Sequence, residues 1–168
     1  TYGSMADYTT ELVQKNQSLF PVDDAVRFAS IIEKLEKGAG KEKNIGTSMS
    51  LMTKAASSGK MDKTGFTQLN EKAPEVVKVL EQSLGKSKAQ LESMAAAGTL
   101  TAKTIKEAFF NAETDIQKKF DNLDLSITDA LTHIRNGWGY WIEQIDSTYK
   151  ITDKVSRFII EVSDKCLS

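Results

Sequence analysis

Glycines divide this chain into short segments, and their spacing limits what it can fold into. Two turns that each begin with glycine, at residues 59–62 and 98–101, bracket two short helical stretches. Pro74 suits the first turn of one stretch, where its missing N–H costs nothing, and Gly85 suits the end of that stretch. Short helices with frequent glycine stops fold back on one another, so the spacing predicts a compact helical body.

The spacing of apolar residues indicates the same fold class. Ala25, Phe28, Ala29, Ile32 and Leu35 follow one another in steps of three and four, which places them on one face of a helix. No segment of four or more residues alternates as a half-buried strand would. We predict an all-α fold: a compact bundle of about eight or nine short-to-medium helices, with short glycine turns and no sheet. The expected helices cover roughly residues 7–19, 22–38, 45–58, 64–69, 74–84, 88–97, 102–120, 127–145 and 151 onward.

The predicted organisation has three parts. Residues 1–5 look like an expression scar. Residues 6–148 are expected to form the helical domain, and residues 149–168 a C-terminal helix that packs on the domain or leads out of it.

A weak internal repeat appears when the sequence is shifted by 39 residues. Gly59 then aligns with Gly98, and Met61 with Leu100, after similar short helices. Two interpretations stay open: a duplicated helical module, or the general likeness of short amphipathic helices.

Composition excludes several classes of protein. The formal net charge is −1 and no basic block occurs, so we expect no contact with nucleic acid. No apolar run approaches the ~20 residues that cross a bilayer. The single cysteine, Cys166, cannot form an internal disulfide and is expected to be a structural thiol.

No residue pattern predicts catalysis, a metal or a cofactor. His133 is the only histidine, and its position one turn after Asp129 indicates an exposed side-chain pair. The stretch at residues 62–66 lacks the alternating acids of a calcium loop, and Gly38-Ala39-Gly40 lacks the spacing of a phosphate loop. No carboxylate was expected on an apolar stripe, which argues against the desolvated acid of a hydrolase.

An aromatic run stands out late in the sequence. Trp138, Tyr140 and Trp141 could form an exposed patch that binds a partner. The alternative places both tryptophans in the core, because residues 134, 138, 141, 142 and 145 share one helical face.

An ordered series of short motifs runs between residues 22 and 145. Its characteristic positions are Phe66, Asn70, Glu71, Pro74, Gly85, Gly98, Leu100, Thr101, Arg135 and Asn136. This series resembles the N-terminal domain of tail tape measure proteins from long-tailed bacteriophages and prophages. The chain departs from the family pattern at residues 62–64, where arginine, glycine and an acid are more usual.

The resemblance implies a structural role and no enzymatic one. Tape measure proteins set tail length during assembly and help DNA cross the host envelope, so the resemblance implies a place in the virion tail and, during assembly, in the host cytoplasm. It also implies tail tube, tail assembly chaperone or baseplate proteins as partners, and leaves oligomerisation open. The alternatives are a peptidoglycan hydrolase domain of a tail protein and a helical interaction module of a non-phage assembly.

Overall fold

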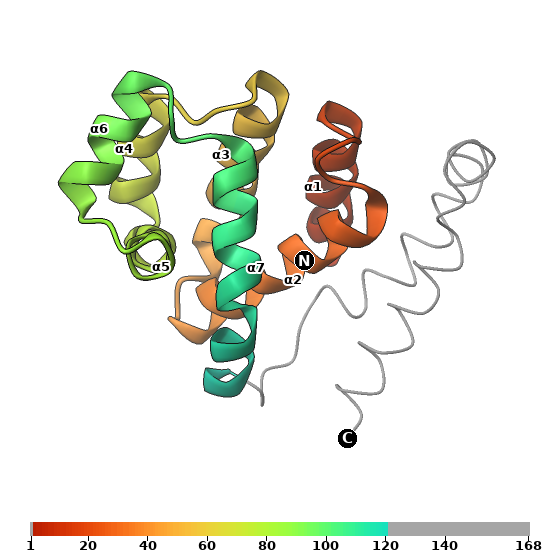
Figure 1. The fold of residues 1–168 in the computed structure, drawn as a ribbon. Coiled ribbons are helices and arrows are strands. Elements are labelled where there is room, and N and C mark those ends of the chain that lie inside the picture. The colour runs from red at the N-terminus through yellow and green to blue at the C-terminus, as the bar shows by residue number, and fades with distance from the viewer. Residues whose placement is uncertain (1, 121–168) are drawn as a thin grey trace.

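The computed structural model describes residues 2–120, and Figure 1 shows their arrangement. Each helix in this part begins or ends close to a sequence signal that favours such a boundary. The elements are α1 (Tyr2–Lys15), α2 (Val22–Gly38), the 3-10 turn η1 (Glu42–Asn44), α3 (Ile45–Ser58), α4 (Lys63–Lys72), α5 (Pro74–Leu84), α6 (Lys88–Ala97) and α7 (Ala102–Lys119).

The all-α prediction is confirmed for this part of the chain. Residues 2–120 contain seven α-helices, where eight or nine were expected over the whole sequence. The helices expected at residues 127–145 and from 151 onward lie outside the described residues. The only strand-like pairing within residues 2–120 is an isolated bridge between Lys60 and Thr101.

The first helix differs from its prediction. It was expected over residues 7–19, yet it begins at Tyr2 and ends at Lys15. It ends early because the side chain of Asn16 accepts a hydrogen bond from the Leu19 backbone N–H at 3.1 Å, which forms a local turn in place of further helix. Met5 is buried within α1, so the interpretation of residues 1–5 as a scar stays a prediction without support from the packing.

Helix α7 lies across the centre of the body and joins two groups of helices (Figure 1). On one side α1 and α2 pack on each other and α2 packs on α7, while α1 also packs on α3. On the other side α4, α5 and α6 contact one another, and α5 packs on α7. The buried stripe of α7 therefore belongs to the core of both groups.

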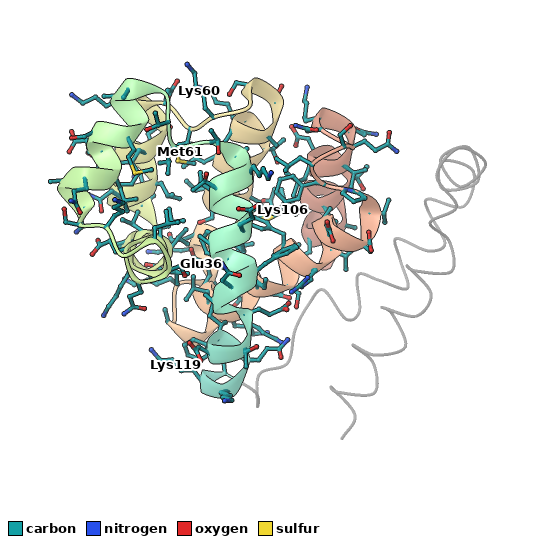
Figure 2. The ribbon with its side chains drawn as sticks, in the orientation of Figure 1. Glu36, Lys60, Met61, Lys106 and Lys119 are labelled. Atoms are coloured by element: carbon teal, nitrogen blue, oxygen red, sulfur yellow. The ribbon has the colours of Figure 1, made fainter. Side chains whose placement is uncertain are left out.

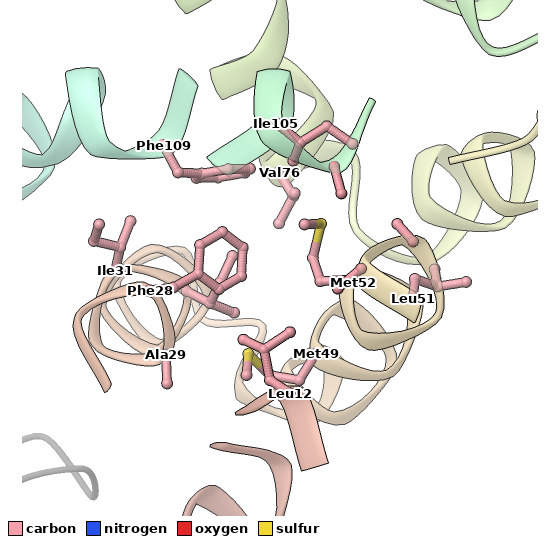
Figure 3. Close-up of a cluster of buried hydrophobic side chains, with 14 of the residues drawn as sticks. Leu12, Phe28, Ala29, Ile31, Met49, Leu51, Met52, Val76, Ile105 and Phe109 are labelled. Atoms are coloured by element: carbon pink, nitrogen blue, oxygen red, sulfur yellow. The ribbon is translucent and has the colours of Figure 1, made fainter. Parts of the chain in front are cut away.

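Aromatic and methionine side chains fill the centre of this core (Figure 3). The ring of Phe28 in α2 makes edge-to-face contacts with Phe20 and Phe109, at centroid distances of 5.3 and 5.5 Å. Met49 and Met52 of α3 are fully buried beside them. Edge-to-face packing of this kind stabilises the folded state by about 1 kcal/mol per ring pair, in addition to the stabilisation that comes from burying the rings.

The 39-residue repeat corresponds to a repeat in the structure. α3 ends at Gly59 with φ 90°, and α6 ends at Gly98 with φ 78°, both in the left-handed region that favours glycine. Each glycine is followed by a buried apolar residue, Met61 or Leu100, and then by the residue that caps the next helix.

The two turns of the repeat also bind each other. The Met61 N–H donates to the Leu100 carbonyl at 2.9 Å, and the Ala102 N–H donates to the Gly59 carbonyl at 3.0 Å. These two bonds flank the isolated antiparallel bridge between Lys60 and Thr101, so the two turns lie side by side. Both interpretations of the 39-residue repeat stay open.

Candidate functional site

Two features of the described residues could carry a function: a buried pair of acids and an open cavity. Glu36 of α2 is fully buried, and the Ser48 hydroxyl of α3 donates to its Oε1 at 3.0 Å. The Asn44 amide of η1 donates to Oε1 of Glu75, the acid of α5 that shares a hydrogen bond with Glu36. Four elements therefore meet at this pair.

The burial of Glu36 corrects an expectation from the sequence. No carboxylate was expected on an apolar stripe, but Glu33 and Glu36 are both buried on α2. The expectation was wrong because Glu36 lies four residues after Ile32 and seven after Ala29, spacings that put it on the same face as those apolar residues. That spacing was the signal that could have revealed it.

The pKa values of the two acids are shifted in opposite directions. Burial, together with the hydrogen bond to Glu75 and the negative charge of Glu75, raises the pKa of Glu36 to about 9. Burial also acts to raise the pKa of Glu75, but hydrogen bonds from Glu36, from its own backbone and from Asn44 outweigh burial and lower that pKa. Oε2 of Glu36 is buried without a hydrogen-bond partner, so protonation of this carboxyl group removes a buried negative charge.

A protonated acid at neutral pH is a pattern shared with general acid catalysts. A general acid must reach its substrate, and the carboxyl group of Glu36 is fully buried. Figure 2 labels Glu36 among the side chains of the body. The contacts made by the pair instead hold η1, α3 and α5 to α2. Among the described residues, no group of three or more His, Cys, Asp or Glu side chains could hold a metal ion.

The cavity lies between the ends of α2, α5 and α7 and has a volume of about 370 Å³. Its apolar lining includes Leu35, Val79, Ile116 and Phe120, and the small side chain of Ala112 leaves room between them. The other half of the lining is polar or charged: Gln82, Ser83, Asn111, Asp115 and Lys119.

A family model described as tape measure protein matches residues 1–147 of the chain. The chain belongs to the tape measure protein family. No curated protein and no solved structure matches it. The match also includes residues 1–21, which the motif series left out.

Membership in the tape measure family makes this chain a structural component of a phage tail. Within residues 2–120, no helix combines the length and the apolar character needed to cross a membrane.

Most tape measure motif residues shape the helices and turns. Phe66 and Leu100 are buried in the core. Pro74 opens α5, Gly85 ends it with φ 63°, and the Thr101 side chain caps α7 by accepting from the Thr104 N–H. The motif positions that carried the resemblance therefore describe how this tape measure domain folds.

The remaining motif and site residues divide into two groups. Asn70 is half-buried at the end of α4, with its Oδ1 atom buried and without a hydrogen-bond partner, and Glu71 beside it is exposed. The others lie outside the described residues, so the interpretations attached to them stay predictions: Arg135, Asn136, Trp138, Tyr140, Trp141, His133 and Cys166.

Proposed function

We propose that this tape measure domain is an assembly module that takes part in tail length determination and tail assembly, and that its parent protein aids DNA ejection. The family match over residues 1–147 is the observation that carries the proposal. On this proposal the domain works in the virion tail, and in the host cytoplasm while the tail is built.

The fold supports a docking role over a ruler role for this part of the chain. A continuous helix rises ~1.5 Å per residue, so a ruler lengthens in proportion to its residues. The helices of residues 2–120 are at most 18 residues long and fold back on one another. A folded module can instead bind a tail tube, tail assembly chaperone or baseplate protein, through polar helix faces or through Trp138, Tyr140 and Trp141.

Deleting residues 1–147 from the parent gene in a lysogen tests this role. A ruler segment of 147 residues would shorten every tail by about 220 Å at ~1.5 Å per residue. An assembly module would instead reduce the number of tails or broaden their length distribution, which electron microscopy of induced particles measures. A uniform shortening of about that size would contradict the proposal.

The proposal also includes the absence of enzymatic activity, because the carboxyl group whose pKa is strongly raised among residues 2–120 is buried. A peptidoglycan digestion assay with the purified chain tests this part. We expect no release of soluble fragments from the wild type or from Glu36→Gln. Digestion by the wild type that disappears in a single-carboxylate variant would establish the hydrolase alternative instead.

A further inference from the structure

Gly38, the last residue of α2, and Phe120, which follows the last residue of α7, pack closely against each other. A Cβ atom added to Gly38 would lie 2.6 Å from Cγ of the Phe120 ring and closer still to two other ring carbons. A side chain at position 38 and the ring of Phe120 in its present place therefore exclude each other. The ring packs on bare backbone, which only glycine offers.

The conformation of α2 does not by itself require glycine at position 38. Positive φ values occur at Gly40, Gly59, Gly85 and Gly98, but not at Gly38. Alanine favours a helix more than glycine does. The feature of the structure that excludes a larger residue at position 38 is therefore the ring of Phe120.

Few side chains attach the last turn of α7 to the rest of the body. Between residues 114 and 119, Ile116 alone is buried, while Lys118 and Lys119 are exposed. Figure 2 labels Lys119 at the end of this helix. Phe120 is half-buried and has left the helix, with φ −130° and ψ 39°. A turn held by so few buried side chains belongs to the part of a fold that opens most readily.

The same residue also forms part of the cavity wall. Phe120 lines the cavity together with Leu35, Val79 and Ile116. It therefore stands between the end of α2 and the cavity. Movement of the ring away from Gly38 would remove this part of the wall and expose apolar side chains of the lining to water.

We propose that Phe120 acts as a latch. While its ring packs on Gly38, it holds the last turn of α7 on α2 and closes one side of the cavity. When the ring leaves Gly38, that turn unwinds and the cavity widens, while the core around Phe28 and Phe109 stays folded. The latch involves only residues 2–120, and it does not depend on the proposed function.

Gly38→Ala tests the latch, because two effects of alanine oppose each other. Alanine strengthens the end of α2, but its Cβ atom displaces the ring of Phe120. We would follow hydrogen exchange of the full chain by mass spectrometry. We expect the amides of residues 117–120 to exchange at least about tenfold faster than in the wild type, and those of residues 105–109 to stay within about twofold.

Phe120→Ala supplies the matched background for this test. By itself it should release the same turn. Gly38→Ala added to Phe120→Ala should cause no further acceleration, because no ring remains to be displaced. Far-UV circular dichroism verifies that the variants retain their helices. If Gly38→Ala fails to fold, the exchange pattern of Phe120→Ala tests the latch without it.

Three results would overturn the proposal. Unchanged exchange at residues 117–120 in the single variants would show that the ring does not hold the last turn. Equal acceleration along the whole of α7 would show that the contact belongs to the core and opens only with it. Acceleration by Gly38→Ala that persists in the Phe120→Ala background would place the effect in α2.

Discussion

Glu36 keeps its proton in the folded chain at neutral pH and loses it in the unfolded chain. Its pKa is about 9 when folded against an ordinary value of 4.5, so the folded state binds more protons than the unfolded state between these two values. The free energy of unfolding therefore falls as the pH rises through that window, by up to about 1.4 kcal/mol per pH unit. Glu75 has a lowered pKa, so the stability that it contributes is lost only on the acid side, as the pH falls below its ordinary value.

We expect Glu36→Gln to remove most of this decline. Glutamine can accept from Ser48 and donate to Glu75, but it cannot ionise. Urea unfolding at about pH 5 and about pH 8 should show a midpoint that falls in the wild type and stays nearly level in the variant.

The exposed Glu92 supplies the control for this prediction. Glu92→Gln should follow the wild-type pH dependence. If the urea midpoints of Glu36→Gln and the wild type fall by the same amount between these pH values, Glu36 is not the group that retains the proton.

A substitution at Gly59 tests the cost of its backbone conformation alone, because an added side chain would not clash with neighbouring atoms. Its φ is 90°, and a Cβ atom added there would meet nothing within 4 Å. We expect Gly59→Ala to lower the free energy of unfolding by about 1–2 kcal/mol, because a side chain is strained in the left-handed region. Gly59→Asn should cost less, since asparagine tolerates that region. Equal urea midpoints for the alanine variant and the wild type would contradict this account.

At the residue scale, local features could be predicted from the sequence and distant pairings could not. A serine or threonine directly before a helical stretch predicts a cap, and Ser87 and Thr101 both accept the capping hydrogen bond, because capping depends on residues three positions away. The pairing of Glu36 with Glu75 depends on how α2 and α5 pack, which no local pattern specifies.

At the scale of elements, glycine and proline signals placed most helix boundaries. α5 begins at Pro74 and ends before Gly85, and α6 ends before Gly98, as predicted. The turn η1 was not predicted, because no glycine or proline separates it from α3. The end of α1 was misplaced because Asn16 also donates to the Ala56 carbonyl of α3 at 2.9 Å, a tertiary contact.

Lys106 joins α7 to the segment between α1 and α2. Its Nζ donates to the Leu19 carbonyl at 2.6 Å and to Asp24 Oδ2 at 2.7 Å, and its side chain is 15% exposed. Lys106→Met keeps the aliphatic stem but leaves the carbonyl and the carboxylate without this donor. We expect a loss of about 1–3 kcal/mol in the free energy of unfolding, measured by urea titration.

Lys103 on the same helix gives the matched control. Its side chain is 75% exposed and its contact with Glu107 measures 4.0 Å. Lys103→Met should change the free energy of unfolding by no more than about 0.5 kcal/mol. Similar losses in both variants would mean that the buried contacts of Lys106 contribute nothing beyond general surface charge.

At the scale of the whole molecule, the sequence predicted the fold class but not the arrangement. The 39-residue repeat was visible, yet only the structure shows that Met61 and Leu100 lie opposite each other in paired turns. Those hydrogen bonds tie the α3–α4 turn to the α6–α7 turn, so helices distant in sequence form one body. Similarly, a helix over residues 102–120 was predicted, but the contacts of α7 with both α2 and α5 were not.

Because both groups of helices pack on α7, we predict that residues 1–120 fold without the rest of the chain. Phe28 packs edge-to-face on Phe20 and Phe109, all three rings are completely buried, and α7 links both groups of helices. A chain ending at Phe120 should unfold in one cooperative transition, with helical circular dichroism and calorimetry giving the same midpoint. Broad, non-coincident transitions or strong binding of a hydrophobic dye would show that the core needs residues 121–168 to close.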